Sequence, residues 1–178
     1  DAVALVERIQ TSGRVAMVDT GGPKLLRRVK VKGATGAAFD AAAQAWVSAP
    51  RRLYAVRQGA RRPEKHPLRL GKGVGGAVAA SPDGLTLAVG AAHGGDLAAL
   101  VDVAGHRVRR FRSGRGPGAP GWSPDGVRVY YADGGAATLS LVSPFAHRRL
   151  RSVALPGTTP LGVVVQPGLA RMQGTDAP

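Results

Sequence analysis

The chain has 178 residues, of which 44% are hydrophobic and 4% aromatic, with 26 Gly and 13 Pro. This composition favours short strands joined by many turns, and the length suits one compact domain over residues 1–178. Its 25 Lys and Arg against 11 Asp and Glu give a net charge of +14, so we expect the surface to attract polyanions. The lack of cysteine excludes disulfides and thiolate metal sites, and no apolar run reaches the roughly 18 residues that span a membrane. Because the sequence begins at Asp1 without a signal-like segment, we expect a soluble chain that has been processed or trimmed.

A repeat runs along the chain. If Phe39, Ala80, Trp122 and Val165 are equivalent, the spacings between them are 41, 42 and 43 residues. A period near 42 residues is typical of β-propeller blades with four strands each. We therefore predict an all-β propeller of about four blades, with repeats at about 1–35, 36–75, 76–117 and 118–160 and a partial repeat at 161–178.

The first two repeats match the pattern less well than the later ones. One period before Trp46 falls near Leu5, which indicates that the chain begins inside a blade, at its second strand, and Val18-Asp19 recurs as Val101-Asp102 two periods later. The second repeat carries Ala41-Ala42-Ala43 where later repeats have Pro-Asp-Gly, so this blade has drifted.

The third repeat shows one blade most clearly. A strand predicted over 76–80 leads into the turn Ser81-Pro82-Asp83-Gly84, and further strands are predicted over 85–90, 96–103 and 107–112. Pro82 sets φ, Asp83 bonds back to the backbone and Gly84 takes positive φ. The fourth repeat uses Pro124, Asp125 and Gly126 in the same way.

An apolar residue also recurs seven positions after each equivalent residue. These residues are Trp46, Leu87, Val129 and Met172. We therefore predict one register across this turn in every repeat, with Trp46 and Trp122 in the core.

This pattern resembles the YVTN-type, YncE-like family of WD-repeat-like bacterial propellers. The matching stretches are residues 78–90, 99–105, 116–118 and 123–131. The resemblance implies four-stranded blades and an extracytoplasmic or secreted location, and a secreted member that binds single-stranded DNA suggests a polyanion partner. The Ser-Pro-Asp-Gly turn alone is less specific, since TolB-like and prolyl-oligopeptidase propellers share it.

The sequence is compatible with two ways of completing the ring. Members of this family resemble larger rings, commonly of seven blades, whereas this chain has room for about four. The strand predicted over 161–166 is of the first type, meaning that it matches the first strand of a blade. It would allow the two ends of the chain to share one blade and close a small ring. The alternative is that the chain is part of a larger ring, or half of an assembly that a partner completes.

Basic residues concentrate in the last strand of each repeat, which lies at the outer edge of a propeller blade. The candidates for polyanion binding are Arg27, Arg28, Lys30, Arg107, Arg109, Arg110, Arg112, Arg148, Arg149 and Arg151. A further group precedes the third repeat: Arg61, Arg62, Lys65, His66, Arg69 and Lys72. Such charge either protects open sheet edges from aggregation or forms a salt-sensitive polyanion surface.

Nucleobase stacking would require exposed aromatic side chains near this charge. The candidates are Tyr54, Phe111, Phe145, Tyr130 and Tyr131. Phe111 lies between two arginines on an alternating strand, so an inward orientation explains it equally well.

No motif indicates catalysis, a cofactor or a metal site. His66, His93, His106 and His147 lack the spacing of metal ligands, and the turns already explain Asp83 and Asp125. Residues 71–76 match G-x-G-x-x-G but lead into a strand instead of a helix.

Three hypotheses follow. The first is a non-enzymatic recognition or scaffold module for a protein or polymer partner. The second is a dedicated binder of nucleic acid or another polyanion, and the third is the propeller part of a larger enzyme.

Overall fold

The computed structural model describes the backbone of residues 2–9, 12–19, 24–92 and 94–165, with side chains over 13–18, 24–92 and 94–165. These residues form four antiparallel sheets and no helix. The first sheet has three strands, β1 (Ala2–Ile9), β2 (Ser12–Asp19) and β3 (Lys24–Lys30). The second comprises β4 (Gly36–Phe39), β5 (Ala45–Ala49), β6 (Arg52–Val56) and β7 (Leu68–Arg69). The third comprises β8 (Val74–Ala80), β9 (Thr86–Ala91), β10 (Leu97–Asp102) and β11 (Arg107–Arg112), and the fourth β12 (Pro117–Trp122), β13 (Val129–Asp133), β14 (Thr138–Ser143) and β15 (Arg148–Ala154).

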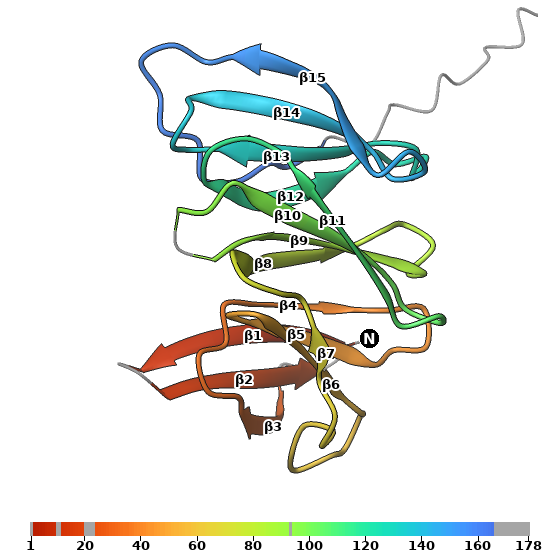
Figure 1. The fold of residues 1–178 in the computed structure, drawn as a ribbon. Coiled ribbons are helices and arrows are strands. Elements are labelled where there is room, and N and C mark those ends of the chain that lie inside the picture. Colours follow the sequence, from red (N-terminus) through yellow and green to blue (C-terminus); the bar gives the residue numbers. More distant parts are fainter. Residues whose placement is uncertain (1, 10–11, 20–23, 93, 166–178) are drawn as a thin grey trace, which may run out of the picture.

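The arrangement of the sheets is propeller-like. Strands within each sheet pair in chain order, and the sheets stack one after another from the first to the fourth (Figure 1). The first strand of the third sheet, β8, contacts both β4 and β12, so first strands line one edge of the stack. The last strands, β3, β7, β11 and β15, form the opposite edges of their sheets, as the sequence predicted.

The two ends of the chain occupy different positions in the repeat. Both β2 and β10 end at the aspartate of the recurring Val-Asp pair, so β1 corresponds to the second-type strand β9, as predicted. At the other end, Ala119 N donates to Leu161 O at 3.1 Å, and Ala119 forms a parallel bridge with Gly162. Residues 161–165 therefore lie beside β12, in the place of a first-type strand, while Gln166 and Met172 fall outside the described residues.

The predicted Ser-Pro-Asp-Gly turns are formed by the residues expected. In the third sheet, Asp83 Oδ1 accepts a hydrogen bond from Leu85 N at 3.0 Å, and Gly84 has a φ of 68°. In the fourth, Asp125 Oδ1 accepts from Val127 N at 3.1 Å, and Gly126 has a φ of 71°. A serine hydroxyl at the start of each turn donates to the same carboxylate.

The register of the second repeat was predicted wrongly. Phe39 pairs with Ala45, whereas Ala80 pairs with Leu87, so the second repeat has one residue fewer between its first two strands. Because side chains alternate between the two faces of a strand, a turn that is one residue shorter moves each following side chain to the opposite face of the sheet. Trp46 consequently points toward the third sheet, whereas Leu87 points back toward the second.

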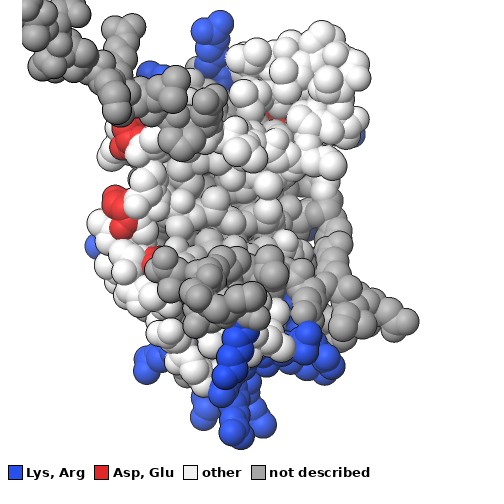
Figure 2. All heavy atoms as spheres, turned by 180° about the vertical axis from the view of Figure 1, so that it is seen from behind, with Lys and Arg blue, Asp and Glu red and all other residues white. Residues whose placement is uncertain are grey.

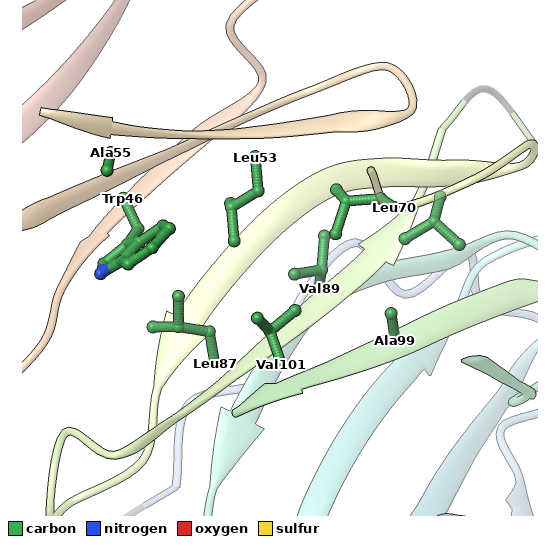
Figure 3. Close-up of a cluster of buried hydrophobic side chains, with 9 residues drawn as sticks. Trp46, Leu53, Ala55, Leu70, Leu87, Val89, Ala99 and Val101 are labelled. Atoms are coloured by element: carbon green, nitrogen blue, oxygen red, sulfur yellow. The ribbon is translucent and has the colours of Figure 1, made fainter. Parts of the chain in front are cut away.

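Three buried clusters fill the boundaries between sheets. Trp46 and Leu53 of the second sheet pack against Leu87, Val89 and Val101 of the third (Figure 3). A cluster around Val15 and Val47 joins the first two sheets. Trp122 was correctly placed in the core and belongs to the third cluster, which also contains Phe111 and Tyr131 and joins the last two sheets.

A buried carboxylate lies near the boundary between the last two sheets. Asp133, at the end of β13, is fully buried and accepts hydrogen bonds from Ser113 Oγ at 3.0 Å, Thr138 Oγ1 at 3.3 Å and the Ser140 hydroxyl. Hydroxyl donors offset the cost of burying this charge. Burial, reinforced by the negative charge of Asp133, raises the pKa of the neighbouring Tyr131 hydroxyl.

Candidate functional site

The arginines of β11 divide between the two faces of the strand. Phe111 packs into the cluster between the third and fourth sheets, and side chains alternate along a regular strand. Arg107 and Arg109 therefore face the fourth sheet, whereas Arg110 and Arg112 face the opposite way.

The two pairs of arginines differ in their partners. Arg112 Nε lies 3.4 Å from Asp96 Oδ2, and the guanidinium of Arg110 lies against Gly71, where an added Cβ would be 2.6 Å from Nη1. Among the described residues, no hydrogen-bond or ion-pair partner meets the guanidinium groups of Arg107 and Arg109, nor that of Arg110.

The basic residues of β15 lie at the far end of the stack. Arg148, Arg149 and Arg151 are all exposed on this outermost strand. Arg149 reaches across to the third sheet, where its Nη1 donates to Ser113 O at 2.6 Å. The predicted candidates are thus spread over three sheets and do not form one continuous site.

A denser group of basic residues joins β3 to the loop between β6 and β7, residues 57–67. Arg27 Nη1 donates to Gly59 O at 2.6 Å, which brings the two segments together. We call the resulting surface the basic cluster: Lys24, Arg27, Arg28, Lys30, Arg57, Arg61, Arg62, Lys65 and His66. All of these side chains are exposed except that of Arg27, which is half-buried. Figure 2 shows Lys and Arg gathered at the lower end of the molecule, where β3 and this loop lie in Figure 1.

The basic cluster contains little compensating negative charge. Glu64 is the only carboxylate in segments 24–30 and 57–67, and its Oε1 pairs with Arg57 Nε at 2.9 Å. A depression of about 360 Å³ is lined by Arg57, Arg62, Glu64, Lys65 and His66, with Ala60. The sequence identified both segments as basic, but their contact through Arg27 joins residues 32 positions apart and was not predicted.

Most described carboxylates outside the basic cluster serve turns and do not neutralise arginines. Asp40 Oδ1 accepts from Ala42 N and Gln44 N, each at 2.9 Å, and Asp102 Oδ1 accepts from Gly105 N at 3.0 Å. In the two Ser-Pro-Asp-Gly turns, the serine hydroxyl and then a backbone N–H hold the pKa of Asp83 and of Asp125 below its ordinary value. The positive charge of the outer strands is therefore largely uncompensated.

The aromatic candidates for base stacking are mostly unavailable. Phe111 and Tyr131 are buried and belong to the core, because the alternation of their strands turns them inward. Tyr54 and Tyr130 are half-buried, and Tyr54 packs against the cluster around Val15 and Val47. Phe145, at 75% exposure, lies in the turn before β15, on a different sheet from either segment of the basic cluster.

Two histidines that the sequence analysis treated as isolated occupy equivalent positions. His106 and His147 each precede the first arginine of a fourth strand and have φ values of 51° and 50°. Their spacing of 41 residues is the repeat period and could have revealed the equivalence. His106 meets the ring of Trp46 edge-on at a centroid distance of 6.1 Å.

Two other features are absent from the described part of the chain. No group of three or more His, Asp or Glu side chains is placed there to hold a metal ion. The same residues contain no helix of the length and apolarity that crossing a membrane requires.

The fold and surface define a propeller-like protein with basic outer strands. No model of a known protein family matches the chain, and no curated protein matches it. Among solved structures the fold is common, with 671 matching chains. One is hydrazine synthase of Kuenenia stuttgartiensis, similar at a TM-score of 0.65 and 18% identity over 80% of this chain and 45% of that chain. This chain therefore spans less than half of that one, and the likeness shows the fold alone.

Proposed function

We propose that this chain is a non-enzymatic recognition module, built as part of a β-propeller, that binds an anionic polymer through the basic cluster. The observation that carries the proposal is the contact of β3 with the 57–67 loop, which concentrates positive charge with one paired carboxylate. The extracytoplasmic setting and the resemblance to YVTN-type propellers belong to the same proposal.

The mode of binding follows from what the basic cluster contains. Lys and Arg contacts to phosphates displace counterions, so affinity falls steeply as salt rises. The basic cluster as defined above contains no Phe, Tyr or Trp, so base stacking adds little. We expect binding that depends on charge density more than on nucleotide sequence.

Fluorescence anisotropy of labelled single-stranded DNA across a salt series tests the proposal, with heparin and a neutral glycan as comparators. The variant Arg61→Gln/Lys65→Gln removes two charges from the basic cluster, and Arg148→Gln/Arg151→Gln removes two from the fourth sheet. We expect the first to raise Kd at least fivefold and the second less than twofold. Equal effects of the two variants, or wild-type binding that does not favour DNA and heparin over the neutral glycan, would leave edge protection as the role of the charge.

We also propose that the propeller has more than four blades. The first and fourth sheets lie at opposite ends of the stack, and no strand pairing joins them among the described residues (Figure 1). Leu161 and Val164 lie in the segment beside β12 and are 81% and 98% exposed, so no sheet of the described residues covers them. A closed four-bladed ring would have a radius of gyration near that of a compact domain of this length, about 16 Å. Small-angle scattering that gives this value would contradict the larger ring.

A second candidate is the propeller part of a larger enzyme. The observation that favours it is the likeness to a chain named hydrazine synthase, of which the match covers 45%. Sequencing the gene beyond both ends of this chain tests the idea, because it requires an adjoining catalytic domain.

A further inference from the structure

The boundary between the third and fourth sheets contains a small polar pocket that the proposed function does not use. It has a volume of about 170 Å³ and is lined by Thr86, Leu100, Asp102, Arg107 and Arg109 of the third sheet. Pro144 and His147, from the turn between β14 and β15, line its other side. We call it the inter-sheet pocket.

The preceding boundary is filled differently at the equivalent place. Ala38 pairs with Trp46 next to the Phe39 position, and Ala79 pairs with Ala88 next to the equivalent Ala80, so Ala88 corresponds to Trp46. The indole of Trp46 meets His106 edge-on at one boundary. At the next, a methyl group replaces the indole, and the equivalent histidine, His147, lines a pocket.

The polar side chains that line the inter-sheet pocket have a net positive charge. Arg107 and Arg109 are exposed and have no partner among the described residues, in contrast to Arg112, which is paired with Asp96. The one carboxylate, Asp102, is turned toward its own loop: Oδ1 accepts from Gly105 N, and Oδ2 lies 2.4 Å from where a Cβ on Gly105 would be. Two guanidiniums thus face the pocket with their donors free.

We propose that the inter-sheet pocket binds a phosphate group, held by Arg107 and Arg109 with His147 as a third donor. Guanidinium groups match the oxygens of phosphate in geometry as well as charge, and a site between two sheets fixes their relative position. This site is distinct from the basic cluster, which neutralises a polymer backbone. A terminal phosphate of a polymer and a free phosphate ion share the required chemistry.

Isothermal titration with inorganic phosphate at constant ionic strength, against acetate, tests the proposal. The variant Arg107→Gln/Arg109→Gln is compared with Arg110→Gln/Arg112→Gln, which removes the same charge from the opposite face of β11. We expect the first to weaken phosphate binding at least tenfold and the second less than twofold, with unchanged melting temperatures verifying the fold. Equal losses in both variants, no loss in the first, or equal binding of acetate would overturn the proposal.

Two further experiments identify the source of the phosphate and distinguish the inter-sheet pocket from the basic cluster. A 5′-phosphorylated oligonucleotide that binds more tightly than its 5′-hydroxyl form identifies a polymer end as ligand, while equal binding of both identifies free phosphate. Arg61→Gln/Lys65→Gln should leave titration with inorganic phosphate unchanged. Polymer binding at the basic cluster and phosphate binding in the inter-sheet pocket are therefore tested by separate measurements, and either can fail without the other. A loss of phosphate binding in this variant would contradict a separate site.

Discussion

The two boundaries on either side of the third sheet are built from the same repeat but are filled differently. Between the second and third sheets, Trp46 occupies the space beside His106, and the Thr35 and Ser48 hydroxyls meet backbone carbonyls. Between the third and fourth, the corresponding indole is absent and a buried Asp133 carboxylate collects hydroxyl donors. The second boundary thus adds a buried carboxylate and an open pocket to its apolar cluster. A repeat therefore conserves strand order while leaving each interface free to differ.

The largest effect is expected from Trp46→Ala. Removing a buried indole leaves a cavity and costs about 3–5 kcal/mol of unfolding free energy. Urea denaturation measures the loss, and Trp46→Phe, which keeps most of the volume but loses the 2.8 Å bond to Asp40, should cost less. A loss below about 1 kcal/mol would show that this boundary does not depend on the indole.

Asp133→Asn tests the polar side of the comparison. The amide presents one acceptor oxygen where the carboxylate presents two, so hydroxyl donors lose their partner at a cost of about 1–3 kcal/mol. Asp96→Asn, at an exposed ion pair with Arg112, should change stability by less than about 1 kcal/mol in the same urea titration. Equal effects of the two substitutions would mean that the buried network contributes nothing specific.

The glycines of the two equivalent turns should respond unequally to alanine. Gly126→Ala introduces a side chain at positive φ with 3.7 Å to the nearest atom, Pro82 Cδ, and should cost about 1 kcal/mol. Gly84 has a similar φ, but a Cβ added in Gly84→Ala would lie 2.3 Å from Ala41 N, so we expect a loss of about 2 kcal/mol. Melting curves of the two variants check the order, and a smaller loss for Gly84→Ala would contradict the close contact between turns.

Mild acid should affect the two turns alike and only slightly. The pKa values of Asp83 and Asp125 are lowered from 3.8 by serine hydroxyl and backbone N–H donors. Their contribution to stability is therefore present above about pH 4 and is lost as pH falls through the folded-state values. Melting temperatures below pH 4 should fall less for Asp83→Asn and Asp125→Asn than for wild type, and to a similar extent in both.

Local patterns in the sequence predicted much of the fold. The period, the Ser-Pro-Asp-Gly turns and the range Arg107–Arg112 follow from short-range chemistry, and observed sheets start within two residues of the predicted repeats at Val74 and Pro117. The facing of Trp46 was missed because the count from Phe39 assumed a turn of constant length. The candidate site was predicted in part: its arginines lie on outer strands, but the partner that distinguishes Arg112 from Arg107 comes from another part of the chain, at Asp96.

By itself the sequence determined the strand order, the turns and the placement of charge on the last strand of each repeat, since these depend on neighbours within a few residues. The tertiary structure alone decided which segments form the basic cluster, because Arg27 and Gly59 are distant in the chain. It also decided where the pocket lies. A pocket is the volume left when two sheets pack, and this one exists only because the turn that carries His147 is brought opposite Arg107 and Arg109.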